Sequence, residues 1–208
     1  FYLFDEEYPF FQVRKEDIAA DKISKAKASS ISGKNINRTI SESGNKLALF
    51  SPKNSKNKEQ LTPSELTRWL LTFQGYSGLS DKVIFGKEKY KVSKGWLFDI
   101  GVVFIQGASL FETLLLNCIL PFYDYGNLES IQCPCWEFAS SDNINRYLFG
   151  SECTDLANLY TIWSRGIYID PEYDLNKPFS FEIVKLPDIN HQDNFLEPMT
   201  TWKYNTKG

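Results

Sequence analysis

The longest apolar stretch of the chain, residues 94–120, limits the folds that the chain can adopt. A helix that spans a membrane needs about 18 uninterrupted apolar residues, whereas Gln106 and Glu112 interrupt this stretch. No membrane partner is therefore expected, and the stretch must be buried in a folded core. We predict a buried strand at residues 102–105, followed by an apolar helix at residues 109–120.

The charge of the chain is strongly asymmetric. Residues 14–94 hold 17 Lys and Arg against 8 Asp and Glu, a balance of +9, whereas residues 95–208 hold 6 against 15, a balance of −9. A basic half of this kind indicates a surface that faces a polyanion, although a solubilising loop would have the same composition. Composition leaves both interpretations open.

A helix is strongly indicated at residues 62–75. Thr62 is the expected N-cap, Pro63 suits the first helical position, and Glu65 completes a capping box. Apolar side chains follow at helical spacing, and Gly75 is the expected end. The predicted apolar face consists of Leu66, Trp69, Leu70 and Phe73.

Two lysine-rich stretches flank this helix. Residues 14–60 are predicted to be a basic loop region, and residues 75–95 a basic β-hairpin or flap. A short helix is expected within residues 1–12. Strand-like runs occur at residues 161–169, 179–185 and 200–204. We therefore expect an α+β fold, a single mixed domain with long basic loops.

The sequence argues against an enzyme. His191 is the only histidine and lies in a polar stretch, where an exposed loop residue is expected. The chain contains neither a glycine-rich phosphate loop nor a nucleophile elbow. Asp170 and Glu172 are expected on the surface of a solvated turn. No catalytic residue and no cofactor are predicted.

Four cysteines are few for a chain of 208 residues. Cys133 and Cys135 are separated by one residue, whereas zinc pairs usually have two intervening residues, and no second pair follows. We expect Cys118, Cys133, Cys135 and Cys153 to be reduced thiols in a cytoplasmic protein, without a metal.

Several short motifs, colinear along the chain, resemble those of one known family. Residues 94–117 carry the most specific match, in which Lys-Gly is followed by Phe-Ile-Gln-Gly and by Leu-Leu-Leu-Asn. Further matching segments are residues 1–12, 36–49, 163–168 and 195–200. Together they resemble the large subunit of the type I-E CRISPR interference complex Cascade, the CasA family.

The resemblance implies that residues 1–208 are part of the N-terminal domain of this subunit, without the C-terminal helical bundle. It implies a non-catalytic protein of antiviral defence that recognises the protospacer-adjacent motif in double-stranded target DNA. Such a subunit also contacts the 5′ handle of the guide RNA and helps to recruit a separate helicase–nuclease. The other Cascade subunits complete the expected partners.

By the same resemblance, nucleic-acid contacts are expected in two places. Ile36, Asn37 and Arg38 fall on the family's loop that reaches the guide handle and a neighbouring subunit. The family's glycine-rich DNA loop falls before Gly95, where this chain has scattered glycines and several lysines. The lysines expected to contact phosphates are Lys87, Lys89, Lys91 and Lys94. We expect the two basic stretches to converge on one polynucleotide.

An assembly scaffold is the alternative function. In that case the basic loop would dock on guide RNA or a partner subunit, and the protein would not read DNA. A third, enzymatic function would require a site that the sequence does not show.

Overall fold

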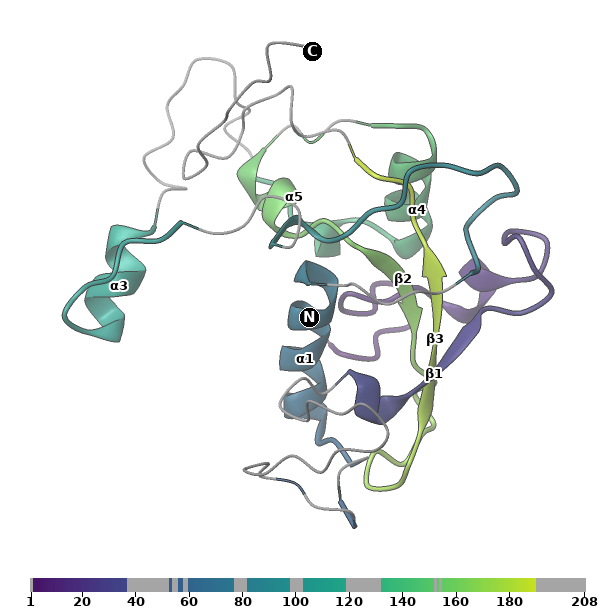
Figure 1. Ribbon diagram of the computed structural model, residues 1–208, viewed down its shortest axis with the longest axis horizontal. Coiled ribbons are helices and arrows are strands. Elements are labelled where there is room, and N and C mark those ends of the chain that lie inside the picture. Colours follow the sequence, from purple (N-terminus) through teal and green to yellow (C-terminus); the bar gives the residue numbers. More distant parts are fainter. Residues whose placement is uncertain are drawn as a thin grey trace.

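A small antiparallel sheet lies at the centre of the molecule (Figure 1). The computed structural model describes residues 2–36, 53, 56–57, 60–76, 82–97, 103–118, 132–151, 153 and 155–189. The strands found there are β1 (Ser29–Ser32), β2 (Arg165–Tyr168) and β3 (Ser180–Lys185), in the order β1-β3-β2. Ser32 pairs with Ser180, and Arg165 pairs with Lys185, so β3 is the central strand.

Helix α1 (Pro63–Gly75) packs on one face of this sheet (Figure 1). The predicted capping box is present, because the Glu65 N–H donates to Thr62 Oγ1 (3.2 Å) and the Thr62 N–H donates to Glu65 Oε2 (2.8 Å). The rings of Phe73 and Phe181 meet edge to face at 5.8 Å. We call this cluster the α1 core; it consists of Ile36, Leu61, Leu66, Leu70, Phe73, Ile167, Ile169, Leu175, Phe179, Phe181 and Ile183.

A second cluster lies on the other face of the sheet. Successive side chains of a strand point to opposite faces, so Ile183 belongs to the α1 core whereas Val184 belongs to this second cluster. Its main helices are α4 (Ser140–Leu148) and α5 (Leu156–Tyr160), and we call it the α4–α5 core. The short 3-10 helices are η1 (Lys15–Ile18), η2 (Gly33–Asn35) and η4 (Cys135–Glu137).

These layers confirm the α+β class and the predicted helix at residues 62–75, but several other local predictions are wrong. Residues 2–12 form turns rather than a short helix. Strand β1 lies inside the stretch that was predicted to be loop. The predicted strand at residues 200–204 lies outside the described residues.

The predicted hairpin at residues 75–95 is also wrong. Its two apolar arms do not pair with each other, because Ile84 bridges to Lys185 and Val92 bridges to Pro187. Both arms therefore extend the edge of the sheet along β3 and the residues that follow it. Each partner is about a hundred residues away in the sequence, so local pattern could not reveal it.

The predicted buried strand at residues 102–105 is wrong in its described part. Val103, Phe104 and Ile105 belong to no strand and are largely exposed. The helix that follows, α3 (Leu110–Leu116), is shorter than predicted and contains no buried residue. Among the helices that the structure describes, none has both the length and the apolar character needed to cross a membrane.

Candidate nucleic-acid interface

Two lysine-rich segments that are 60 residues apart in the sequence lie side by side. Ile23 forms an antiparallel bridge with Phe85. The Ser24 N–H donates to the Ile84 carbonyl oxygen, and the Gly86 N–H donates to the Lys22 carbonyl oxygen, both at 2.9 Å. We call residues 22–27 and 82–89 the basic pair, because these hydrogen bonds join them into one surface element.

The basic pair carries six exposed lysines and one acidic residue, Glu88. Between the lysines, Ile23, Val83 and Phe85 are buried in the α4–α5 core, with exposures of 3% or less. The apolar residues therefore anchor the backbone while the lysines remain exposed, the Lys22 ammonium lying 3.9 Å from Asp17 Oδ1. The lysines are Lys22, Lys25, Lys27, Lys82, Lys87 and Lys89.

The basic pair is attached to the end of the central strand. The Lys185 N–H donates to the Val83 carbonyl oxygen (2.9 Å), and the Phe85 N–H donates to the Lys185 carbonyl oxygen (3.1 Å). The Tyr90 hydroxyl donates to the carbonyl oxygens of Phe85 (3.1 Å) and Lys185 (2.8 Å). These bonds hold the segment in place before any ligand arrives, which lowers the entropic cost of binding.

The four lysines predicted to contact phosphate differ in their surroundings. Lys87 and Lys89 are exposed on the basic pair. Lys91 is exposed but pairs with Asp188, with 2.5 Å between Nζ and Oδ2. Lys94 is half-buried. The carboxylate beside Lys91 offsets its charge, so a polyanion should gain less from Lys91 than from Lys87 or Lys89.

Gly95 was predicted to contact nucleic acid, but the structure gives it a role in packing. It is buried, with a φ of +78°. A Cβ atom at this position would lie 2.2 Å from the Gln74 carbonyl oxygen and 2.6 Å from that of Gly75. Gly95 therefore lets the chain pass directly against the end of α1, and a contact with nucleic acid stays a prediction.

A buried polar network surrounds this crossing point. The Arg165 side chain is 4% exposed, and its Nη1 donates to the carbonyl oxygens of Ser93 (2.8 Å) and Ser164 (2.7 Å). The buried Gln74 amide donates to the Arg165 carbonyl oxygen (2.9 Å) and accepts from the Ser164 N–H (2.8 Å). Ser93, four residues after the basic pair, is thereby tied to β2 through Arg165, which Gln74 in turn ties to α1.

The residues predicted to reach the guide handle lie elsewhere. Ile36 is fully buried in the α1 core, with 0% exposure. Asn37 and Arg38 lie outside the described residues. The first basic stretch thus meets the second through residues 22–27 and not through Ile36, and the guide contact stays a prediction.

The sheet fixes the distance between the strand that leads to Ile36 and the basic pair. Ser32, four residues before Ile36, pairs with Ser180, whereas Ile84 bridges to Lys185. Five steps along β3 at about 3.4 Å each separate the two attachment points by about 17 Å. Ser32 and Ile84 therefore pair with opposite ends of β3.

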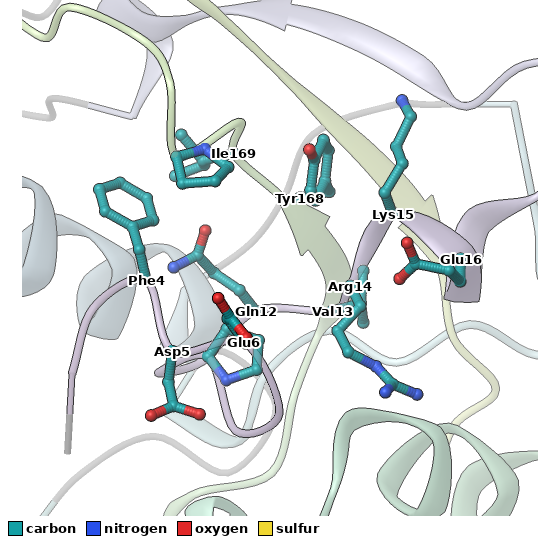
Figure 2. A pocket seen from close by; sticks show the side chains of 12 residues that line it. Phe4, Asp5, Glu6, Gln12, Val13, Arg14, Lys15, Glu16, Tyr168 and Ile169 are labelled. Atoms are coloured by element: carbon teal, nitrogen blue, oxygen red, sulfur yellow. The ribbon is translucent and has the colours of Figure 1, made fainter.

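A pocket of about 290 Å³ lies between the N-terminal segment and β2 (Figure 2). Lys15 and Tyr168 line this pocket, and the Lys15 ammonium lies 4.9 Å from the Tyr168 ring centroid and 2.5 Å from Glu182 Oε2. Burial raises the pKa of Tyr168, and backbone N–H donors, first that of Tyr8, lower the pKa of Asp5. Neither shift prepares a base or nucleophile near neutral pH, so the pocket does not indicate catalysis.

The comparison with known families agrees with the motifs in the sequence. The family model of the CRISPR-associated protein Cse1 matches residues 1–208. The chain belongs to the Cse1 family. This family is the CasA family of type I-E Cascade large subunits, so the resemblance is confirmed and the chain is a subunit of a multi-subunit CRISPR complex. No curated protein and no solved structure matches the chain.

Cse1-family proteins are in general non-catalytic Cascade subunits. Two of the cysteines in this chain are buried thiols. Burial raises the pKa of Cys135 and of Cys153 to about 12, which keeps both protonated at neutral pH. Asp170 accepts a hydrogen bond from the Glu172 N–H (3.0 Å) in a turn. In the part of the chain that the structure describes, no three metal-ligating side chains come together.

Sequence reasoning missed that Lys22, Lys25 and Lys27 adjoin the second lysine-rich stretch of this Cse1-family protein. One signal was available, because Ile23 is an isolated apolar residue among lysines and therefore a candidate anchor. Its partner, Phe85, could not be identified without the fold. The charge asymmetry of the sequence placed these lysines in its basic half, and their contact with a polyanion stays a prediction.

Proposed function

We propose that this chain recognises the protospacer-adjacent motif of double-stranded target DNA, with the basic pair holding the DNA backbone. The observation that carries the proposal is the pairing of residues 22–24 with residues 84–86. It joins six exposed lysines on an anchored surface. A duplex carries one phosphate per about 3.4 Å of each strand, so closely spaced ammonium groups suit its backbone.

The chemistry of this surface supports backbone contact more than base reading. Lysine ammonium groups bind phosphates as point charges, and such contacts position a duplex without reading its sequence. In an RNA-guided complex, guide pairing supplies most of the specificity, so the protein needs to read only a short motif. The basic pair would hold the duplex while that motif is read.

The remaining parts of the proposal rest on family membership. We propose that Asn37 and Arg38 contact the 5′ handle of the guide RNA, and that the subunit helps to recruit the helicase–nuclease. Ile36, directly before these two residues in the sequence, is anchored in the α1 core. Residues 1–208 would be part of the N-terminal domain of a subunit that acts in the cytoplasm.

The test is the salt dependence of DNA binding by the assembled complex. Lys87→Ala/Lys89→Ala should weaken binding and reduce the slope of log K against log[salt] by about 1.8, at about 0.9 per lost phosphate contact. Lys177→Ala is the matched control, because Lys177 is 76% exposed and lies in the β2–β3 connection, away from the basic pair. An unchanged slope in the double variant would contradict the proposal.

A second variant distinguishes an assembly scaffold from a subunit that binds DNA. Because Ser32, four residues before Ile36, and Ile84 of the basic pair lie beside opposite ends of β3, the two contacts should fail independently. Asn37→Ala/Arg38→Ala should impair assembly with guide RNA, whereas Lys87→Ala/Lys89→Ala should impair only DNA binding. If the lysine variant failed to assemble instead, the basic pair would be an assembly surface.

A further inference from the structure

Residues 103–118 form a small unit that is closed by its own hydrogen bonds. The Asn117 side chain accepts from the Ile105 N–H (2.8 Å) and donates to the Ile105 carbonyl oxygen (2.7 Å). The Thr113 hydroxyl accepts from the Gly107 N–H (3.0 Å), and Ser109 caps the helix by accepting from the Glu112 N–H (3.2 Å). We call this the α3 unit. Its shape is set by polar contacts within the unit.

The apolar side chains of the α3 unit face solvent. Phe111 is 72% exposed, Leu110 is 75% exposed, and no residue of α3 is buried. Figure 1 shows α3 projecting from the layers formed by the sheet and the other helices. The large apolar residues that are at least 46% exposed are Val103, Phe104, Ile105, Leu110, Phe111, Leu114, Leu115 and Leu116.

The exposed apolar area matches that of a protein interface. An aromatic side chain has a surface of roughly 150–250 Å² and an aliphatic one somewhat less, so eight of them about 60% exposed present on the order of 800 Å². The largest apolar patch of a typical monomer is about 300–600 Å². A standard interface buries about 800 Å² on each partner. The α3 unit thus exceeds an ordinary surface patch and reaches the size of one side of a stable complex.

The charge of the α3 unit argues against nucleic acid as its ligand. Residues 103–118 contain no Lys or Arg and one acidic residue, Glu112. A polyanion would gain nothing from such a surface. Helices that lie on membranes usually carry Lys and Arg on their polar face, and α3 carries none. An apolar protein surface is the chemistry that remains.

We propose that the α3 unit docks on an apolar surface of another protein subunit of the same complex. The chain belongs to a family whose members act in a multi-subunit assembly, which supplies such a partner. Phe111 and Leu114, one helical turn apart, are the expected anchors, because they are 72% and 62% exposed. This surface is separate from the basic pair, so the inference does not depend on the proposed DNA contact.

The first test measures assembly with the neighbouring subunits and guide RNA. Phe111→Asp/Leu114→Asp should weaken the affinity for the rest of the complex at least about 100-fold. The variant loses the favourable burial of two large apolar side chains and must bury two carboxylates instead. Phe149→Asp is the control, since Phe149 is 83% exposed outside the α3 unit. Equal affinities of the double variant and the control would overturn the proposal.

A second test uses the exposed thiol of Cys118, at the end of the α3 unit. In a Cys133→Ser background, a maleimide should modify Cys118 in the free subunit and should react at least about tenfold more slowly in the complex. Unchanged reactivity after assembly would overturn the proposal. Protection of Cys118 already in the free monomer would also overturn it, because the subunit's own chain would then cover the α3 unit. So would a dimer of the free subunit that Phe111→Asp/Leu114→Asp dissociates, because a second copy would then be the partner. Neither variant removes a hydrogen bond of the α3 unit, and circular dichroism verifies its fold.

Discussion

Replacing Gly95 with alanine should destabilise the protein for two separate reasons. The first is backbone strain, because Gly95 has a φ of +78°, where a residue with a Cβ costs roughly 1–2 kcal/mol. The second is steric, because the new Cβ would lie 2.2 Å from the Gln74 carbonyl oxygen. Relieving such an overlap means moving α1 away from the chain, and overpacking of this kind costs roughly 1–3 kcal/mol.

Gly86 provides a matched control that isolates the steric part. Its φ is +69°, yet a Cβ there would meet nothing within 4 Å. We expect Gly86→Ala to lower the free energy of unfolding by about 1–2 kcal/mol, and Gly95→Ala by about 2–5 kcal/mol. For a chain of this length, the difference should lower the melting temperature by roughly 5 °C more in the Gly95 variant.

Urea titration and thermal melting, both followed by circular dichroism, measure these changes. Equal destabilisation by the two substitutions would refute the packing role of Gly95. A loss of nucleic-acid affinity by Gly95→Ala at unchanged stability would also refute it, and would place Gly95 in the interface that family resemblance suggests.

Three further predictions concern a surface pair, a helix cap and the buried thiols. Asp188→Asn should remove the carboxylate charge beside Lys91 and strengthen DNA binding up to about fivefold in a filter-binding assay, whereas weaker binding would contradict the role of that pair. Thr62→Ala should lower the free energy of unfolding by about 1 kcal/mol, and no change in urea midpoint would show that the cap contributes nothing. Burial raises the pKa of Cys135 and of Cys153 from 9.0 to about 12, so their contribution to stability is complete below pH 9 and lost as the pH rises through 12. Replacing both cysteines with alanine should make the free energy of unfolding fall less steeply above pH 9. An equally steep fall in the variant and the wild type would contradict this.

Helix α1 could be predicted from the sequence because its signals are local. Thr62 and Glu65 are three residues apart and satisfy each other's backbone groups. The apolar residues recur at helical spacing, so the buried face followed from the pattern, with Leu66, Leu70 and Phe73 buried and Trp69 partly buried. Every partner needed to identify the helix lies within its own turns.

The edge of the sheet could not be predicted, because its partners are distant. Ile84 pairs with Lys185, and Ile23 pairs with Phe85. A run such as Val83-Ile84-Phe85 indicates an extended segment but does not say which strand it joins. A local hairpin was therefore the simplest prediction, and it failed for that reason.

Apolar composition also failed to predict burial at residues 103–105. The pattern of Val103, Phe104 and Ile105 is typical of a buried strand, yet the Asn117 side chain binds the backbone of Ile105 as a neighbouring strand would. The hydrogen bonds are satisfied within the unit while the side chains remain exposed. Whether an apolar run faces a core or a partner depends on contacts that the sequence does not specify.

Residues 22–27 and 82–89 are proposed to form one surface that binds nucleic acid. Lysine acetylation of the assembled complex, with and without target duplex and read by mass spectrometry, tests it most directly. We expect DNA to protect Lys25, Lys27, Lys87 and Lys89 together, while Lys177 reacts equally in both states. Protection of only one of the two segments, or of neither, would contradict it.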